Sequence, residues 1–320
     1  MSDGAHLLIP FAAAPAPGCR EALERLQLPQ VKRLLERLQA GAVDAADGRS
    51  LSPPHERVLA RASALAAPDG CLPWAAWQVE QERKDQGGAG GQAWAWITPC
   101  HWHVATDHIV MNHPMDLRLN GEDSQALLAA MQPFFSQDGI ALEYHAPTRW
   151  LARGELFRGL ATASLDRVLN RDIDEWVPRA AAASPLRRLQ QEMQMLLYTH
   201  AVNDARVRAG LLAVNSFWAS GTGALPADPL PAAPAGLLLP HSLRDAALLQ
   251  DWSAWSAAWQ QVDAVQCRQL NESLDRGQPV TLTLCGESNA RSWSGPETGW
   301  WRRLRGAMTR QPLSNLFETL

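Results

Sequence analysis

Two short runs with the character of buried strands lie near opposite ends of this 320-residue chain, and they constrain its fold most strongly. Residues 6–12 (HLLIPFA) form the first and residues 280–285 (VTLTLC) form the second, and each is followed by residues that favour turns. Segments with helical spacing of apolar residues occur nearby, at 28–38 and 248–262. Strands that alternate with helices at both ends predict an α/β fold, with helices on both faces of a core sheet.

The middle of the chain has a different pattern, which predicts a second structural part. Residues 93–99 (AWAWITP) alternate like a strand, and residues 185–210 have the clearest helical spacing in the chain. We therefore expect a smaller α+β lobe over residues 94–208, inserted into a discontinuous α/β core of residues 1–93 and 209–320. The chain length and the 46% hydrophobic composition are sufficient for such an arrangement.

Charge and composition argue against several classes of protein. The formal net charge is −4, so the chain has no global basic field of the kind that attracts nucleic acid. No apolar stretch reaches membrane-spanning length, and the first residues lack the pattern of a secretory signal. The five cysteines are scattered and include no CxxC pair, which favours reduced thiols in a cytoplasmic protein.

Residues 98–108 (TPCHWHVATDH) concentrate groups that bind metals. On an extended strand His101 and His103 share one face, and with Asp107 or His108 they would bind zinc or manganese. The alternative is that these imidazoles contact solvent or backbone carbonyls. Since no second cluster has metal-finger spacing, the sequence favours a protein without a cofactor and leaves such a metal site as the alternative.

Two polar segments beside predicted strands are candidates for binding an anion. The first is "VNSFWASGTG" with the helix before it, where a glycine turn would present backbone N–H groups; its candidates are Asn203, Arg206, Ser220, Gly221, Thr222 and Gly223. The second follows the late strand and contains Glu287, Ser288 and Asn289. The alternatives are a glycine turn that closes a core strand, a bracing role for Asn203, a solvated Arg206, and a capped turn at 287–289.

Aromatic residues cluster at two places near the C-terminal end. Trp252, Trp255 and Trp259 have helical spacing, which is typical of a core or of a seam between lobes. A basic and aromatic cluster follows, and it would contact an acidic partner, an anionic membrane surface or nucleic acid, or else be a solvated segment: Trp300, Trp301, Arg302, Arg303 and Arg305.

Two segments, residues 122–150 and 200–223, resemble the cofactor-independent phosphoglycerate mutases of the archaeal type, which belong to the alkaline phosphatase superfamily. The second segment is similar to the family's "HPVN…R…G…N…WLWGQG" stretch at His200, Val202, Asn203, Arg206, Gly210, Asn215, Trp218, Gly221 and Gly223. The resemblance implies an α/β core with a smaller inserted lobe. It also implies phosphoryl transfer that uses two divalent metals and a serine nucleophile.

The departures from that family are as informative as the matches. The family has Asp-Gly directly after its first strand, where the aspartate holds metal, whereas this chain has Pro10 and Phe11. The family's late strand leads into an Asp-His pair, whereas residues 286–289 here are Gly-Glu-Ser-Asn. Because two metals require several carboxylates and imidazoles at core strand ends, we interpret the two-metal site as lost.

The opening "LLIPFAAAPAPG" and the helix "QQEMQMLLYTHAVN" are also similar to the proteobacterial RpfE-type family, which implies a link to regulation. We therefore expect a catalytically degenerate phosphoglycerate-mutase-like protein that binds an unknown protein partner or a small anionic ligand. The alternative is an active metal-dependent phosphomutase or phosphohydrolase with a rebuilt site at His101, His103, Asp107 or His108.

Overall fold

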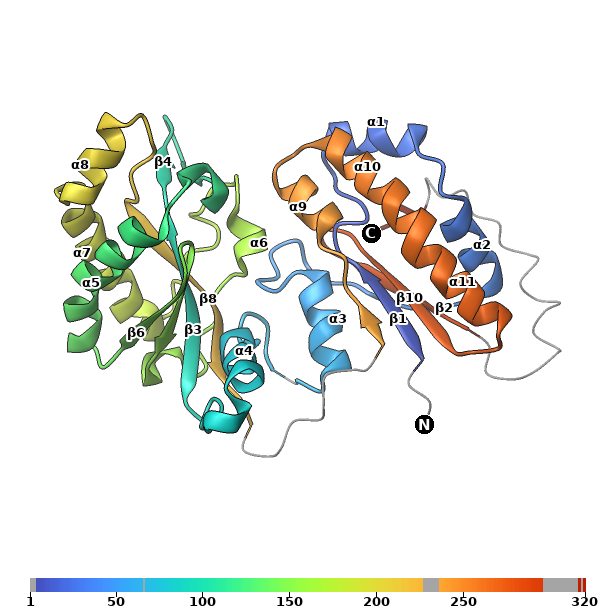
Figure 1. Ribbon diagram of the computed structural model, residues 1–320, viewed down its shortest axis with the longest axis horizontal. Helices are drawn as coiled ribbons and strands as arrows, with labels where there is room; N and C mark the ends of the chain where they lie inside the picture. The colour runs from blue at the N-terminus through green and yellow to red at the C-terminus, as the bar shows by residue number, and fades with distance from the viewer. Residues whose placement is uncertain (1–3, 66, 227–235, 296–315, 318) are drawn as a thin grey trace. The chain divides into compact units, whose positions relative to one another are not determined.

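The structure is a computed structural model that describes residues 4–65, 67–226, 236–295, 316–317 and 319–320. The chain forms two compact units, which Figure 1 shows with their helices and strands. The first unit combines residues 1–64 with residues 231–320, and the second consists of residues 65–230. Within the described residues, every helix is too short or too polar to serve as a membrane-spanning segment.

The first unit contains a mixed sheet of five strands, in the order β2 (Gln39–Asp44), β11 (Ala290–Ser294), β10 (Val280–Cys285), β1 (Ala5–Ile9) and β9 (Leu237–Leu238). β1 pairs in parallel with β10, from Ala5 opposite Val280 to Ile9 opposite Leu284, and it also pairs in parallel with β9. β11 is antiparallel to β10 and to β2. The centre of this sheet is therefore built from both ends of the chain, as the two strand-like runs predict.

Helices cover both faces of this sheet, which confirms the predicted α/β class. Leu8 and Cys285 pack with Val58 of α3 (Pro54–Ala62) on one face. On the other face α11 (Arg268–Asp275) contacts β1 and β10. The remaining helices of this unit are α1 (Pro17–Arg25), α2 (Pro29–Arg37), α9 (Ser242–Leu248) and α10 (Trp252–Val262), the last of which carries the fully buried Trp255 and Trp259.

A π-helical turn, Asp263–Cys267, joins α10 to α11 and directs one carboxylate to the start of α2. Asp263 accepts hydrogen bonds from the backbone N–H groups of Val31 at 2.7 Å and Gln30 at 3.3 Å. The residue before α2, Leu28, has no side chain that can cap the helix. The first-turn N–H groups of α2 are thus satisfied by a residue more than 200 positions away in the sequence.

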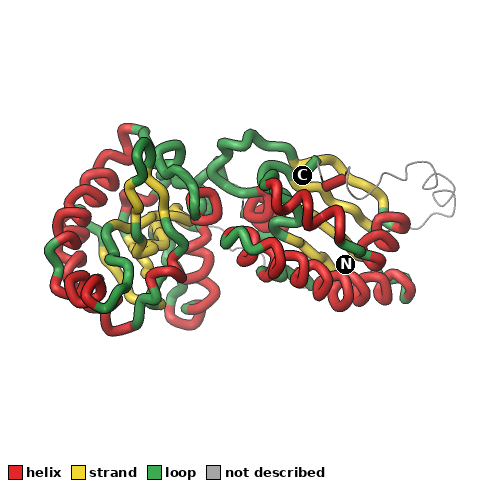
Figure 2. The backbone as a smooth tube through the Cα atoms, turned by 90° about the horizontal axis from the view of Figure 1, so that it is seen from above, coloured by secondary structure: helices red, strands yellow, loops and turns green. Residues whose placement is uncertain are grey.

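The second unit contains an antiparallel sheet of four strands, in the order β6 (Ala141–Ala146), β7 (Arg149–Arg153), β3 (Ala93–Cys100) and β8 (Ser216–Ala224). Its core combines side chains of the sheet with those of α5 (Gly121–Gln137) and α7 (Ser184–Tyr198). α4 (Trp74–Glu82) contacts β3 and β8 as well. Figure 2 shows helices of this unit on either side of its strands.

The other elements of the second unit are short. They are the hairpin of β4 (Trp102–Val104) and β5 (Ile109–Met111), the helices α6 (Leu165–Val168) and α8 (Ala201–Arg208), and four 3₁₀ turns, Lys84–Gln86, Pro114–Leu117, Glu155–Phe157 and Ala181–Ala183. The single helix predicted over 185–210 is therefore wrong, because α7 ends at Tyr198 and α8 begins at Ala201. His200 caps α8, since its ring nitrogen accepts a hydrogen bond from the N–H of Val202.

The boundaries of the second unit differ from the predicted 94–208. β8 lies beyond residue 208, yet it is hydrogen-bonded to β3 from Ser216 opposite Cys100 to Ala224 opposite Ala93. α4 precedes residue 94 and contacts the same two strands. The glycine-rich connector at 85–92 links α4 to β3 inside one unit, so its composition indicates a loop and not a domain boundary.

Candidate functional site

The first candidate site is the edge of the first unit's sheet at which β1 and β10 end. Because the two strands are parallel, their carboxyl ends lie side by side, and ligands of α/β proteins bind at such edges. The chain stays attached to this edge after β1, since the backbone N–H of Ala12 donates to the carbonyl of Cys285 at 2.7 Å. We call the residues that directly follow the two strands, 10–13 and 286–289, the β1–β10 edge.

Phe11 occupies the centre of the β1–β10 edge in a left-handed backbone conformation, with φ of 51°. Its ring is buried and lies 5.8 Å from the ring of His55, and its carbonyl accepts a hydrogen bond from Trp255 Nε1 at 2.9 Å. The next carbonyl, that of Ala12, accepts from Trp259 Nε1 at 3.2 Å. Two indoles of α10 therefore hold an unusual backbone conformation in which an aromatic side chain faces the core.

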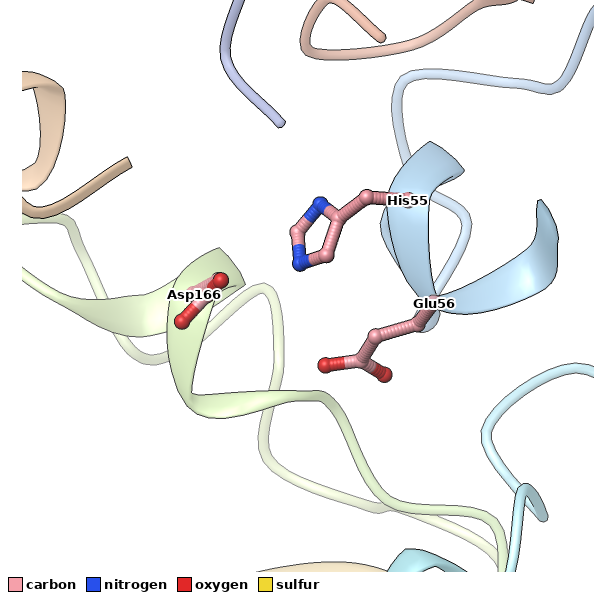
Figure 3. Close-up of side chains that lie close together, drawn as sticks. All are labelled: His55, Glu56 and Asp166. Atoms are coloured by element: carbon pink, nitrogen blue, oxygen red, sulfur yellow. The ribbon is translucent and has the colours of Figure 1, made fainter. Parts of the chain in front are cut away.

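The start of α3 brings polar groups of the first unit to the same region. His55 and Glu56 lie on the first turn of this helix (Figure 3), and the His55 side chain is buried. The guanidinium of Arg57 donates to the carbonyl of Ser288 at 3.0 Å, which ties α3 to the turn after β10. Asp166, also drawn in Figure 3, belongs to the second unit, where it is a buried residue in the first turn of α6.

The turn between β10 and β11 consists of residues predicted as ligand candidates or as a capped turn: Glu287, Ser288 and Asn289. It is closed by the N–H of Gly286, which donates to the carbonyl of Asn289 at 2.9 Å. The backbone N–H of Asn289 donates to the carbonyl of Leu320 at 3.0 Å, and its side chain donates to the carbonyl of Thr319 at 3.1 Å. Polar groups of this turn therefore bind residues 319 and 320 of the same unit.

The residues of the β1–β10 edge do not fit a pair of divalent metal ions. Pro10 and Phe11 stand where the resembling family has Asp-Gly, and the carbonyl oxygen of Phe11 already accepts a hydrogen bond from Trp255. Cys285 is fully buried, and burial raises the pKa of its thiol, which disfavours a metal-binding thiolate. Within the described residues of the first unit, no three ligand atoms from His, Cys, Asp or Glu side chains converge on one point.

In the second unit, the structure brings together the two segments that carry most of the predicted site residues. The N–H of Trp102 donates to the Asn215 side chain at 2.7 Å, and that side chain donates back to the Trp102 carbonyl at 2.9 Å. Nδ1 of His101 lies 2.8 Å from the carbonyl oxygen of Ala213. The histidine-rich strand is thus fixed to the segment that leads into β8.

Asn203 and Arg206 are buried on one face of α8 and hold its surroundings together. The Asn203 side chain donates to the carbonyls of Leu197 and Val214, at 2.8 and 2.7 Å, and accepts from the N–H of Val214 at 2.9 Å. Arg206 is 2% exposed; its guanidinium pairs with Asp123 at 3.0 Å and donates to the carbonyls of Leu117 and Leu212. These contacts are those of a residue that braces its surroundings, as one alternative for Asn203 states. The alternative that Arg206 is a solvated charge is wrong, because its side chain is buried.

The predicted glycine turn at 220–223 is also wrong, because these residues continue β8. A register shift opposite Trp94 and Trp96 accommodates Gly221, whose φ is 61°. A Cβ at Gly221 would lie 2.8 Å from the ring of Trp96, so this tight packing requires glycine. Ser220 is buried, and the hydroxyl of Thr222 donates to the carbonyl of Leu160 at 2.5 Å.

The four predicted metal ligands of the histidine-rich segment do not converge. His101 binds the Ala213 carbonyl, His103 lies exposed on β4, and Asp107 pairs with His108 at 2.6 Å in the exposed connection between β4 and β5. The hydrogen bond with the His108 ring lowers the pKa of the Asp107 carboxyl. In the described part of the chain, these side chains form no group of three ligand atoms within bonding reach.

A surface groove between α7, α8 and residues 213–215 was not predicted. It encloses about 580 Å³, and its lining residues are Leu197, Tyr198, Asn203, Asp204, Val207, Arg208, Ala213 and Asn215. Tyr198 is 86% exposed and Val207 is 61% exposed, which is unusual for large apolar side chains in one hollow. The available sequence signal was that Tyr198 falls outside the apolar face of α7, which Leu186, Leu189, Met193 and Leu197 form. We call this feature the α7–α8 groove.

The basic and aromatic cluster at residues 300–305 lies outside the described residues. Its five members are Trp300, Trp301, Arg302, Arg303 and Arg305. Their predicted contact with a partner therefore stays a prediction.

Comparisons with known proteins give low similarity. No family model and no curated protein matches the sequence. Among solved structures, a cofactor-independent phosphoglycerate mutase from Thermoplasma acidophilum is similar over 99% of this chain and 98% of its own, with 12% identity and a TM-score of 0.39. The PH0037 protein from Pyrococcus horikoshii is similar over 92% of this chain and 88% of its own, with 12% identity and a TM-score of 0.46.

Proposed function

We propose that this chain is a phosphoglycerate-mutase-like protein that has lost phosphoryl-transfer chemistry and acts by binding, in a regulatory role. The motif resemblance over residues 122–150 and 200–223 relates it to that family. The observation that carries the proposal is the Pro10-Phe11 pair at the end of β1. Where the family has Asp-Gly directly after the first strand, with a metal-binding aspartate, this chain has Pro10 and the buried ring of Phe11, and the carbonyls of Phe11 and Ala12 are bonded to Trp255 and Trp259.

The ligand in this proposal is a protein partner or a small anion. The α7–α8 groove supports a binding role, because it combines the exposed Tyr198 and Val207 with the charged side chains of Asp204 and Arg208. A cytoplasmic location is part of the same proposal. It is supported by the five cysteines, all of which are free thiols in the structure.

Activity assays on the intact protein test the loss of chemistry. Phosphoglycerate isomerisation and aryl-phosphate hydrolysis are measured with added Mn²⁺, Co²⁺ or Zn²⁺, and a cofactor-independent phosphoglycerate mutase is the positive control. We expect no turnover above the blank, because the β1–β10 edge lacks the side chains that would hold ions to neutralise phosphate charge and activate a nucleophile. Metal-dependent turnover that a chelator abolishes would overturn the proposal and favour the active-enzyme alternative.

A further inference from the structure

Phe317, Thr319 and Leu320 contact residues at and beside the β1–β10 edge of the first unit. Figure 1 marks the chain end C in this unit. The Phe317 ring lies 5.7 Å from the ring of Trp259, at an interplanar angle of 71°. Phe317 is 5% exposed and Leu320 is 9% exposed, so both side chains are buried in this contact region. Trp259 also donates to the Ala12 carbonyl, so one indole contacts both Phe317 and the segment that follows β1.

The same surface binds the backbone of this segment. The main-chain N–H and the side-chain amide of Asn289 donate to two successive carbonyls, those of Leu320 and Thr319. Gly286 permits the close approach, because a Cβ at this position would lie 2.4 Å from the carbonyl carbon and oxygen of Leu320. The surface thus combines an aromatic contact for one side chain with paired donors and a glycine for the chain itself, which is the composition of a peptide-binding site.

We propose that the surface formed by Trp259, Gly286 and Asn289 is a peptide-docking site that Phe317, Thr319 and Leu320 occupy in cis. A partner segment with phenylalanine followed three positions later by leucine takes the place of Phe317 and Leu320. This inference rests on the proposed binding role and is independent of the proposed loss of phosphoryl transfer. The cis segment is tethered, so its high effective concentration suppresses binding of a free peptide until its own anchor is weakened.

Three substitutions in the full-length chain test this. Phe317→Ala removes the anchor of the cis segment and leaves the docking surface unchanged. Gly286→Ala places a methyl group against the Leu320 backbone, so it blocks the docking surface for any segment. Gly48→Ala is the matched control, because its Cβ would meet only Ser288 Oγ, at an ordinary 3.7 Å, in the same unit. Circular dichroism establishes that each variant is folded.

The first readout is hydrogen exchange at the Asn289 amide, which donates to Leu320. We expect exchange at least about tenfold faster in Phe317→Ala and in Gly286→Ala than in the unsubstituted chain, and no change in Gly48→Ala. Unchanged exchange in Phe317→Ala would overturn the proposal, because docking of the segment would not depend on its aromatic anchor.

The second readout is binding of the free pentapeptide Leu-Phe-Glu-Thr-Leu. We expect it to bind Phe317→Ala at least about tenfold more tightly than the unsubstituted chain and to restore Asn289 protection. The peptide with alanine in place of phenylalanine should do neither, and Gly286→Ala should bind no peptide. Failure of the pentapeptide to bind Phe317→Ala, or equal binding to Gly286→Ala, would overturn the docking site. Metal-dependent turnover would overturn only the proposed loss of chemistry.

Discussion

At the scale of single residues, polar side chains that were predicted to bind a ligand make hydrogen bonds within the protein. Asn203 and Arg206 are three positions apart, so one face of α8 buries both. Spacing alone predicts that shared face, and it does not reveal that the acceptors are carbonyls as distant as those of Leu117 and Val214. The bracing role of Asn203 could therefore be predicted, whereas the burial of Arg206 could not.

Replacement of Asn203 tests this structural role. Asn203→Ala removes three hydrogen bonds and leaves the buried backbone N–H and carbonyl of Val214 without these partners, so the free energy of unfolding should fall by about 2–4 kcal/mol. Asp204→Ala is the control on the exposed side of the same turn and should change it by about 0.5 kcal/mol or less. Denaturant unfolding measures both. Equal effects would contradict the bracing role.

His6 gives the structure a predicted dependence on pH. Its Nε2 lies 2.9 Å from Thr283 Oγ1 across the β1–β10 pairing, and burial lowers its pKa below the ordinary value of 6.5. On acidification, the His6 imidazole of the unfolded chain therefore becomes protonated at a higher pH than that of the folded chain. The contribution of His6 to stability is complete above pH 6.5 and is lost as the pH falls through the lowered pKa of the folded state.

The comparison of the unsubstituted chain with His6→Gln isolates this effect. We expect the free energy of unfolding of the unsubstituted chain to decrease more on acidification below pH 6.5 than that of His6→Gln, which cannot titrate. Chemical denaturation at a series of pH values measures the difference. Parallel pH profiles for the two proteins would contradict the assignment to His6.

At the scale of helices and strands, the periodicity of apolar residues predicted those elements that bury an apolar face. β1, β10 and α2 follow the apolar patterns that indicated them. The break between α7 and α8 and the continuation of β8 through its glycines were missed. In both cases the deciding contact is not local: His200 caps α8 with its side chain, and Gly221 packs on Trp96 of a neighbouring strand.

The cap that Asp263 provides for α2 is a prediction at this scale. Asp263→Ala should lower the free energy of unfolding by about 1–2 kcal/mol, because two N–H groups in the first turn of α2 lose their acceptor. Asp275→Ala is the matched control, because Asp275 is a second aspartate that binds α2. It does so from α11, through half-exposed ion pairs with Arg33 and Arg37. Its loss should cost under about 1 kcal/mol. Thermal unfolding that ranks the two variants in the reverse order would contradict the capping role.

At the scale of the whole molecule, the α/β class could be predicted because both ends of the chain contain strand patterns beside helices. The boundaries of the two units could not, because β8 joins β3 through backbone hydrogen bonds that leave no composition signal. That Pro10 and Phe11 follow the first strand was visible in the sequence. What occupies the edge was not visible, because residues from α3 and α10 and Phe317 meet in this region only after folding.

The central claim is that the β1–β10 edge no longer holds a pair of metal ions. Equilibrium dialysis of the intact protein against Mn²⁺, and separately against Zn²⁺, tests it most directly when metal content is measured per chain beside a cofactor-independent phosphoglycerate mutase. At concentrations that load the control enzyme with two ions, we predict that this chain does not bind two, and that Phe11→Ala does not alter its metal content. Two tightly held ions per chain would contradict the claim.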